Sequence, residues 1–325
     1  MLWATSVMPD PLRLDVHRAD HKLAGRLLLP EDPGPHPAVI FVHGDGAMPW
    51  DAHGYYTPFM QALTNAGFAV YAWDKPGVGA STGNWLNQSM QARADEVIAA
   101  ADTLRSDGRI QPDSIGLLGF SQAGWVMPKA IAAQPDFAYM VSISGAINWI
   151  EQSEFMTRNR LRLEGATDAQ IREALEFDRL LVDLMSKDAP YHTYTSLVEG
   201  APSCCRSAMS QARWIFAKTN FRSDATAALR HVDIPVLALF GDRDLNVDAM
   251  QSAATYRDIL GQTPGEVRVV TLKNADHSLL PASRDRLVTS GFGLMKRLIK
   301  IDIFGADAFA DDAVGRVVRW ISAQE

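Results

Sequence analysis

The sequence predicts an α/β protein built on a mostly parallel β-sheet. Short, continuous apolar runs typical of buried strands alternate along the chain with helical segments. Hydrophobic residues make up 47% of the 325 residues, which is enough for a sizeable core. In such a sheet, ligands bind outside the carboxyl ends of the strands, so functional residues are expected there.

The expected elements follow in chain order up to residue 147. Strands are expected at 12–16, 22–29, 37–42, 68–73, 114–118 and 137–143, and helices at 55–66, 90–105 and 125–133. The Gly-rich loop from Asp74 to Gly83 lacks both the Gly-Lys-Ser/Thr ending of a P-loop and the spacing of a dinucleotide-binding loop. We therefore predict no phosphate site in it. His43, Ser121 and Ser144 are each expected at the carboxyl end of a strand.

Ser121 lies between a buried strand and a helix, in the stretch Gly119-Phe120-Ser121-Gln122-Ala123-Gly124. Small residues around a serine in a strand–turn–helix are typical of a nucleophile elbow, because side chains at 119 or 123 would strike the neighbouring strand or helix. The usual pattern has Gly where this chain has Ala123, and Gly124 comes one residue later. The stretch predicts that Ser121 is a nucleophile and that the Gln122 N–H faces a developing oxyanion.

A second Gly-rich turn follows the strand at 37–42. It reads His43-Gly44-Asp45-Gly46. Glycines at such a turn let the backbone approach a ligand closely. We predict that the backbone N–H of Asp45 is the second oxyanion donor.

The pattern changes between Asn148 and Arg230. Buried strand runs stop, and amphipathic helical patterns with many aromatic residues replace them; Thr167-Asp168-Ala169-Gln170 predicts a capped helix start. We predict a helical insertion at residues 148–230 between two parts of one core, residues 1–147 and 231–325. Because it leaves the sheet at the strand ends, this insertion is expected to form a lid over Ser121. A helical satellite packed away from Ser121 is the alternative.

An acid and a histidine follow the two late strands, which are expected at 234–240 and 267–272 on either side of a helix at 248–260. Asp244 comes after the first strand and His277 after the second. One helix and one strand separate them, so they are expected at neighbouring strand ends. Asp242 and Asp248 are competing candidates for the acid.

These motifs, in this order, resemble the α/β-hydrolase superfamily, and within it bacterial serine esterases related to the dienelactone hydrolases. The resemblance covers most of the chain outside residues 148–230. It implies the α/β-hydrolase fold, with an eight-stranded, mostly parallel sheet flanked by helices, and hydrolysis through an acyl-enzyme by Ser121, His277 and Asp244. Dienelactone hydrolases proper use a cysteine at the position of Ser121, so the serine favours an ordinary esterase.

The expected activity is that of a carboxylesterase-type serine hydrolase acting on a small, partly apolar or aromatic ester. The same triad also cleaves amides, thioesters or activated carbon–carbon bonds. Some proteins with this fold instead sense ligands, with slow hydrolysis or none. The sequence leaves these alternatives open.

Charge and composition narrow the expected partners. The net charge of −7 gives no general attraction for nucleic acid or anionic lipid, and no apolar run approaches the length of a membrane span. Adjacent Cys204 and Cys205 are expected to be reduced thiols, and the eight scattered histidines suggest no metal site, so we expect no cofactor and no metal. Residues 1–6 show no signal-peptide pattern, which favours a cytoplasmic protein with a small-molecule substrate. Formation of a homo-oligomer stays open.

Overall fold

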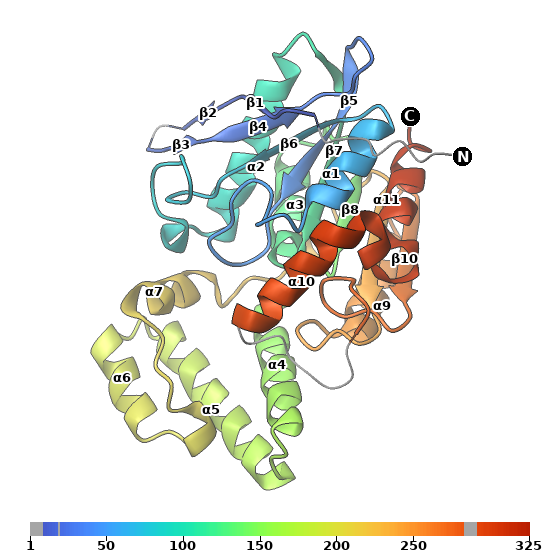
Figure 1. Cartoon of the computed structure of the whole chain (residues 1–325). Coiled ribbons are helices and arrows are strands. Elements are labelled where there is room, and N and C mark those ends of the chain that lie inside the picture. The colour runs from blue at the N-terminus through green and yellow to red at the C-terminus, as the bar shows by residue number, and fades with distance from the viewer. Residues whose placement is uncertain (1–8, 19, 283–290) are drawn as a thin grey trace.

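The computed structural model describes residues 9–18, 20–282 and 291–325, and its centre is an eight-stranded sheet in the order β1-β4-β6-β5-β7-β8-β9-β10 (Figure 1). From β6 to β10 along this order all strands are parallel, whereas β4 is antiparallel to β6 and β1 to β4. This confirms the predicted eight-stranded, mostly parallel sheet. The strands are β1 Leu12–Arg13, β2 Val16–His17, β3 Lys22–Leu23, β4 Gly25–Leu28, β5 His36–Val42, β6 Ala69–Trp73, β7 Ile110–Phe120, β8 Met140–Ile143, β9 Val236–Gly241 and β10 Val267–Leu272.

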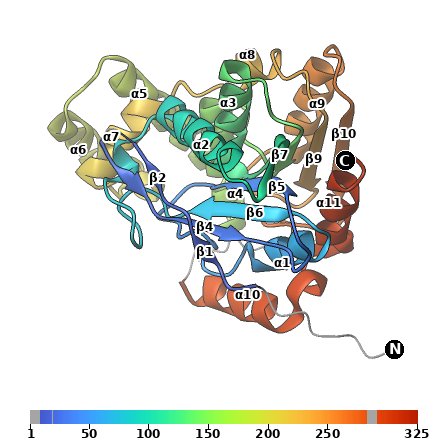
Figure 2. The same ribbon diagram turned by 90° about the horizontal axis from the view of Figure 1, so that it is seen from above.

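Helices cover both faces of the sheet, as buried parallel strands require. In Figure 2, α2, α3 and α9 lie on one face, and α1, α10 and α11 lie on the other. The helices are α1 Thr57–Asn65, α2 Met90–Arg105, α3 Met127–Ala133, α4 Trp149–Leu163, α5 Asp168–Ser186, α6 Tyr191–Glu199, α7 Gln211–Asn220, α8 Thr226–Leu229, α9 Ala249–Leu260, α10 Gly291–Phe304 and α11 Ala313–Ile321.

The strand β7 extends further than its apolar pattern. It begins at Ile110, where it pairs with His36, and residues 111–114 carry no apolar run because this part of the strand is mostly exposed. Conversely, β8 begins at Met140, three residues after the expected start. The ends of strands carry neither an alternating nor a continuous apolar pattern, so the first and last residues of β7 and β8 could not be predicted accurately from the sequence.

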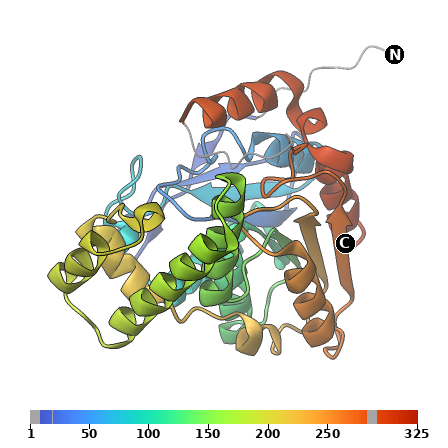
Figure 3. The same cartoon turned by 90° about the horizontal axis from the view of Figure 1, so that it is seen from below.

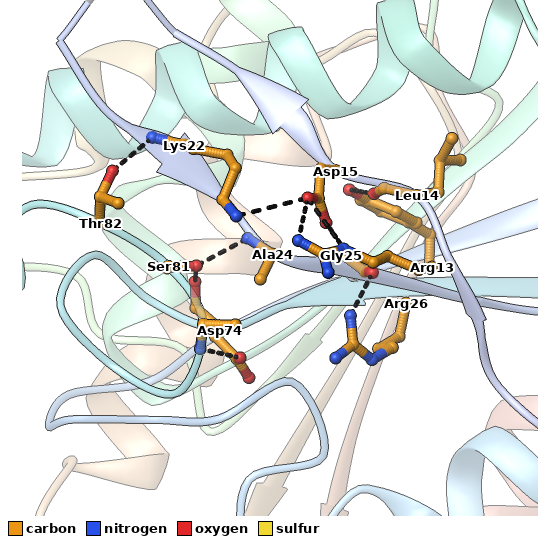
Figure 4. A network of polar contacts seen from close by, with 12 residues as sticks. Arg13, Leu14, Asp15, Lys22, Ala24, Gly25, Arg26, Asp74, Ser81 and Thr82 are labelled. Carbon is orange, nitrogen blue, oxygen red and sulfur yellow. Dashed lines mark hydrogen bonds and ion pairs between the residues drawn. The ribbon is translucent and has the colours of Figure 1, made fainter.

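The loop from Asp74 to Gly83 is hydrogen-bonded to the residues around β3 and β4 and to the turn after β5 (Figure 4). The Ser81 hydroxyl donates to the Asp74 carbonyl at 2.6 Å and accepts from the Ala24 N–H at 2.7 Å. The Thr82 hydroxyl accepts from the Lys22 N–H at 2.8 Å. The Asp74 carboxylate accepts from the N–H groups of Ala80 and Trp50. These bonds give the loop a fixed shape between β4 and the turn after β5.

Residues 148–230 form helices α4 to α8 between β8 and β9, two strands that lie side by side in the sheet. The capping box predicted at Thr167 is present: its hydroxyl accepts from the Gln170 N–H, and the Gln170 side chain accepts from the Thr167 N–H. Helices α5 to α7 pack around their own apolar cluster, centred on Trp214 and Tyr194, whose rings stack at 4.3 Å. Seen from below, the bright green α4 lies in front of the sheet (Figure 3), and in Figure 1 it extends downward away from the sheet.

Two sequence expectations concern the termini and membranes. The N-terminal stretch 1–6, on which the expected lack of a signal peptide depends, lies outside the described residues. Within the described ranges, no helix is long and apolar enough to cross a membrane.

Candidate active site

The turn after β7 has the strained geometry of a nucleophile elbow. Ser121 has φ of +53°, a left-handed conformation that is unusual for a residue with a Cβ and that clusters at functional sites. It follows β7 directly and begins a 3₁₀ turn, Ser121–Trp125, that leads into α3. The first turn after the serine is therefore 3₁₀ rather than α-helical, and Gln122 lies in it.

Small residues fit this turn, but the residue that comes nearest to the neighbouring backbone is Gly124, one position later than in the usual pattern. A Cβ on Gly119 would lie 2.6 Å from both the Ala123 Cβ and the Met127 Sδ, as the sequence predicted. The Ala123 side chain itself is fully buried and fits. The backbone contact with the neighbouring loop occurs at Gly124, where a Cβ would lie 2.5 Å from the Ala146 carbonyl oxygen. This explains why Ala is tolerated at 123 while Gly stands at 124.

Asp244 and His277 meet at the neighbouring ends of β9 and β10. The Nδ1–H of His277 donates to Oδ2 of Asp244 at 2.7 Å, and the Asp244 side chain is inaccessible to solvent. The other carboxylate oxygen of Asp244 accepts from the N–H groups of Asn246 and Val247. The Arg243 N–H donates to the Ala275 carbonyl at 2.9 Å, which joins the two loops. With Nδ1–H facing the acid, Nε2 of neutral His277 is free of a proton and can act as a base.

The surroundings of His277 favour its charged form. Burial lowers the pKa of the ring, but the charge and hydrogen bond of Asp244, with a further contribution from Asp276, outweigh burial, so the pKa lies above the ordinary value. Asp276 is in turn hydrogen-bonded by Arg297 of α10 and by the N–H groups of Ser278 and Leu280. The Tyr55 hydroxyl donates to the Ser278 carbonyl at 2.9 Å. These contacts hold the loop that carries His277.

The competing candidates have other surroundings. Asp242 is exposed, and Asp248 accepts the N–H groups of Met250 and Gln251 as the N-cap of α9. Ser144 follows β8 as predicted and has φ of +48°, but its hydroxyl is buried and has no hydrogen-bond partner among the residues that the structure describes. His43 follows β5 and is also buried. Burial lowers the pKa of His43 to about 3, and its Nε2–H donates to the Trp73 carbonyl at 2.5 Å.

The turn at residues 43–46 passes beside Ser121, and it is called the oxyanion loop below because its Asp45 is predicted to supply an oxyanion donor. A Cβ on Gly44 would lie 3.3 Å from the Phe120 carbonyl oxygen and 3.5 Å from the Ser121 Cβ. The Asp45 carboxylate accepts from the Gln122 side-chain amide at 3.1 Å. The two residues predicted to supply oxyanion donors are therefore in contact with each other.

A cavity of about 490 Å³ brings these residues together. Ser121, Gln122, Asp45 and His277 all line it. Much of the remaining wall is apolar or aromatic and comes from four parts of the chain, namely the segment after the oxyanion loop, the turn after β7, α4 and α10. Its lining includes Tyr55, Trp125, Trp149, Met156, Leu298 and Ile301.

Two arginines at this cavity were missed by the sequence reasoning. Arg213 of α7 donates to both carboxylate oxygens of Asp45, at 3.0 and 2.6 Å, and Arg297 of α10 pairs with Asp276. Both lie on helices remote in sequence from the motifs, and an arginine on an amphipathic helix carries no signal of its own. Among the described residues, no group of three His, Cys, Asp or Glu side chains could hold a metal ion.

Comparisons with known proteins identify the family and the fold of the chain. The family model described as serine aminopeptidase, S33, matches residues 33–282. A sequence search of curated proteins gives no match. Among solved structures, an esterase of Pyrococcus furiosus superposes with a TM-score of 0.57 and 16% identity, covering 97% of this chain and 92% of its own.

Two further structures have the same fold. A dienelactone hydrolase from Anabaena variabilis gives a TM-score of 0.52 at 16% identity, covering 98% of this chain and 97% of its own. A 2,6-dihydroxy-pseudo-oxynicotine hydrolase gives 0.54 at 18% identity and covers 83% of this chain, which spans 63% of that protein. The match over residues 33–282, together with the sheet and the strand-end loops, shows that the chain belongs to the serine aminopeptidase S33 family and is a hydrolase of the α/β-hydrolase type.

Proposed function

We propose that the protein is a serine hydrolase that cleaves a carboxylic ester of a small, partly apolar or aromatic substrate through an acyl-enzyme. The observation that carries the proposal is the cavity that Ser121 and His277 both line, with the buried Asp244 hydrogen-bonded to the far side of the His277 ring. Nucleophile, base and orienting acid are the parts that acyl transfer requires.

In the proposed mechanism, Nε2 of His277 takes the Ser121 hydroxyl proton as Oγ attacks the substrate carbonyl carbon. Asp244 fixes the ring orientation and stabilises the imidazolium that forms. His277 then protonates the leaving alcohol, which departs and leaves the acyl group on Ser121. Water, deprotonated by His277, attacks this ester, and as the second tetrahedral intermediate collapses, His277 returns the proton to Ser121 Oγ, which releases the acid and restores Ser121.

The oxyanion of each tetrahedral intermediate would lie between the backbone N–H groups of Gln122 and Asp45. Each such donor contributes on the order of 3 kcal/mol to transition-state stabilisation. The contact between Gln122 and Asp45 and the passage of Gly44 beside Ser121 support this assignment.

The charges around the cavity favour an ester over the amino-terminal peptide bond that the family description names. An aminopeptidase must bind a free ammonium group, which calls for an unpaired carboxylate. Of the described residues that line the cavity, Asp45 alone is acidic, and Arg213 occupies both of its oxygens. The two arginines of the lining are themselves ion-paired, Arg213 with Asp45 and Arg297 with Asp276, so this lining suits an uncharged group better than a free ammonium.

Residues 148–230 act as a lid in this proposal. Trp149, Gln152, Ser153 and Met156 of α4 and Arg213 of α7 line the same cavity as Ser121. A roof of this kind excludes water and strengthens the interactions with the oxyanion. The satellite alternative, with the insertion packed away from Ser121, gives no reason for these contacts.

The test uses four matched substrates. Three carry the same aromatic acyl group in an ester, a thioester or an anilide, and the fourth is the anilide of an aromatic amino acid with a free amino group. The ester is expected to have the highest kcat/KM. A clear preference for the aminoacyl anilide would replace the esterase proposal with an aminopeptidase. Hydrolysis of none of the four would count against the acyl-transfer proposal.

A further inference from the structure

The loop from Asp74 to Gly83 was excluded as a phosphate site, yet it carries a buried lysine directly behind the oxyanion loop. Lys75 is 2% exposed, and its Nζ donates to the carbonyl oxygens of Gly44 at 2.7 Å and Gly46 at 3.0 Å. The Lys75 N–H donates to the Met48 carbonyl at 3.0 Å. The lysine is therefore attached to the oxyanion loop at two points, and to the residues just after the loop at a third.

A second buried cation reaches the same loop from α2. Arg93 is 4% exposed, and its Nη2 donates to the His43 carbonyl at 2.6 Å. Its Nη1 donates to the side-chain oxygen of Gln122. Arg93 thus contacts both halves of the proposed oxyanion hole, but it is not one of the described residues that line the cavity.

The planarity of the peptide bond gives these contacts a consequence. In a trans peptide the C=O and N–H point in opposite directions across one rigid unit. The carbonyl of Gly44 and the N–H of Asp45 belong to the same unit, so a donor that holds the Gly44 carbonyl on the Lys75 side directs the Asp45 N–H to the other side. Gly44 and Asp45 both line the cavity there. The same reasoning joins the His43 carbonyl, held by Arg93, to the Gly44 N–H, which is directed to the Tyr56 hydroxyl, so Arg93 fixes the start of the loop.

We propose that Lys75 and Arg93 are positioning residues that hold the oxyanion loop from behind, so that the Asp45 N–H faces the reacting carbonyl at Ser121. This inference rests on the proposed serine hydrolase function. Lys75 performs this role through two N–H bonds, which both the ammonium and the neutral amine can donate. Neither side chain touches the substrate.

A buried cation in this place is costly, which argues for a specific role. Burial, and next the charge of Arg93, lower the pKa of Lys75 well below its usual range. The Asp45 and Glu96 carboxylates offset part of this cost for both cations. An apolar side chain at 75 would avoid the desolvation but leave two carbonyls of the loop unpaired.

The test compares Lys75→Met with the wild-type enzyme in covalent labelling by a fluorophosphonate probe. Two quantities are measured, namely the second-order rate constant and the final fraction of labelled protein. A positioning role predicts that the rate constant falls by about 10- to 100-fold, which is a smaller loss than the removal of a complete oxyanion donor causes. Labelling should still reach completion. Tyr71→Phe, which removes a bond to the Leu14 carbonyl at the far edge of the sheet, is the matched control and should label at the wild-type rate.

Three outcomes would overturn the inference. If Lys75→Met only lowers the labelled fraction while the remaining molecules react at the wild-type rate, Lys75 is merely structural. If Lys75→Met does not fold, Arg93→Met takes its place, and a wild-type rate constant in that variant has the same meaning. A wild-type protein that does not label at Ser121 would refute the proposed function and this inference together, whereas the first two results refute the inference alone.

Discussion

At the residue scale, the assignment of Asp244 as the triad acid rests on one hydrogen bond and is tested by two substitutions. Asp244→Asn leaves the side-chain volume but removes the charge that holds the Nδ1–H tautomer of His277, so kcat/KM should fall by about 10⁴-fold. Asp242→Asn changes an exposed neighbour and should stay within about twofold of wild type, the expectation for surface changes. Ester hydrolysis by the two variants, with circular dichroism as a check of folding, decides between them. Equal losses would contradict the assignment.

The pKa of His277 makes a second prediction. Because the base must be neutral, kcat/KM should rise with pH through a midpoint above about 6.5, the ordinary value for histidine. Asp244 raises this pKa and burial lowers it, so Asp244→Asn should move the midpoint to lower pH while reducing the rate. Profiles measured from pH 5 to 9 test both signs. A midpoint that stays in place, or a flat wild-type profile with chemistry rate-limiting, would refute this account of the base.

The residues found from sequence and those missed differ for a physical reason. Ser121 and His277 lie where short-range patterns change, at a strand–turn–helix and at a strand end, so local sequence indicates them. Lys75 and Arg213 act through backbone carbonyls or through a carboxylate on another element. Their partners are 31 and 168 residues away in the chain. No local pattern encodes such contacts.

At the scale of elements, the lid proposal predicts different effects for two exposed apolar residues of the insertion. Met156 of α4 is 41% exposed and lines the cavity, whereas Leu180 of α5 is 51% exposed and does not. Met156→Ala should change the ranking of esters with different acyl groups by kcat/KM, because it alters contacts in the transition state. A change of about 1–3 kcal/mol, or 10- to 200-fold, in relative specificity is expected for lost apolar contact.

Leu180→Ala is the matched control and should leave that ranking unchanged. If both variants change only the melting temperature, the insertion is a structural satellite and the lid proposal fails.

The sequence predicted the helical character of residues 148–230 because the 3.6-residue period and the Thr167 capping box are local. The position of α4 over the sheet depends on contacts such as the stacking of Trp125 on Trp149, which only the fold brings together.

At the scale of the whole molecule, the ion pair of Arg213 with Asp45 joins the insertion to the oxyanion loop. Its side chains are 32% and 42% exposed, so its contribution to the free energy of unfolding should be about 0.2–1 kcal/mol. Its contribution to catalysis should be larger, because Asp45 belongs to the loop that carries an oxyanion donor. Arg213→Gln is therefore expected to lower kcat/KM by about tenfold, less than the loss of a whole donor.

Lys187→Gln is the control for this prediction. It removes an ion pair with Asp183 that is more exposed and lies within the insertion, away from the cavity residues. Chemical denaturation and ester kinetics are measured on both variants. If Arg213→Gln changes kcat/KM no more than Lys187→Gln does, the ion pair does not couple the insertion to the oxyanion loop.

The sheet was predictable as a whole because buried parallel strands are unbroken apolar runs, and the chain order of Ser121, Asp244 and His277 then placed them at its carboxyl edge. The part of the cavity wall that α10 forms was not predictable. In this helix, Leu298 and Ile301 reach the cavity and Arg297 holds Asp276. A helix such as α10 can pack on any sheet face, and nothing in its sequence indicates that it lines an active site.

The central claim is that Ser121 is the nucleophile, and fluorophosphonate labelling followed by peptide mass spectrometry tests it most directly. The wild-type protein should take up one phosphonyl group, on the peptide that contains Ser121, while Ser121→Ala should fold normally, lose the label and lose ester hydrolysis. A label that persists in Ser121→Ala, or that lies on Ser144 in the wild type, would contradict the account.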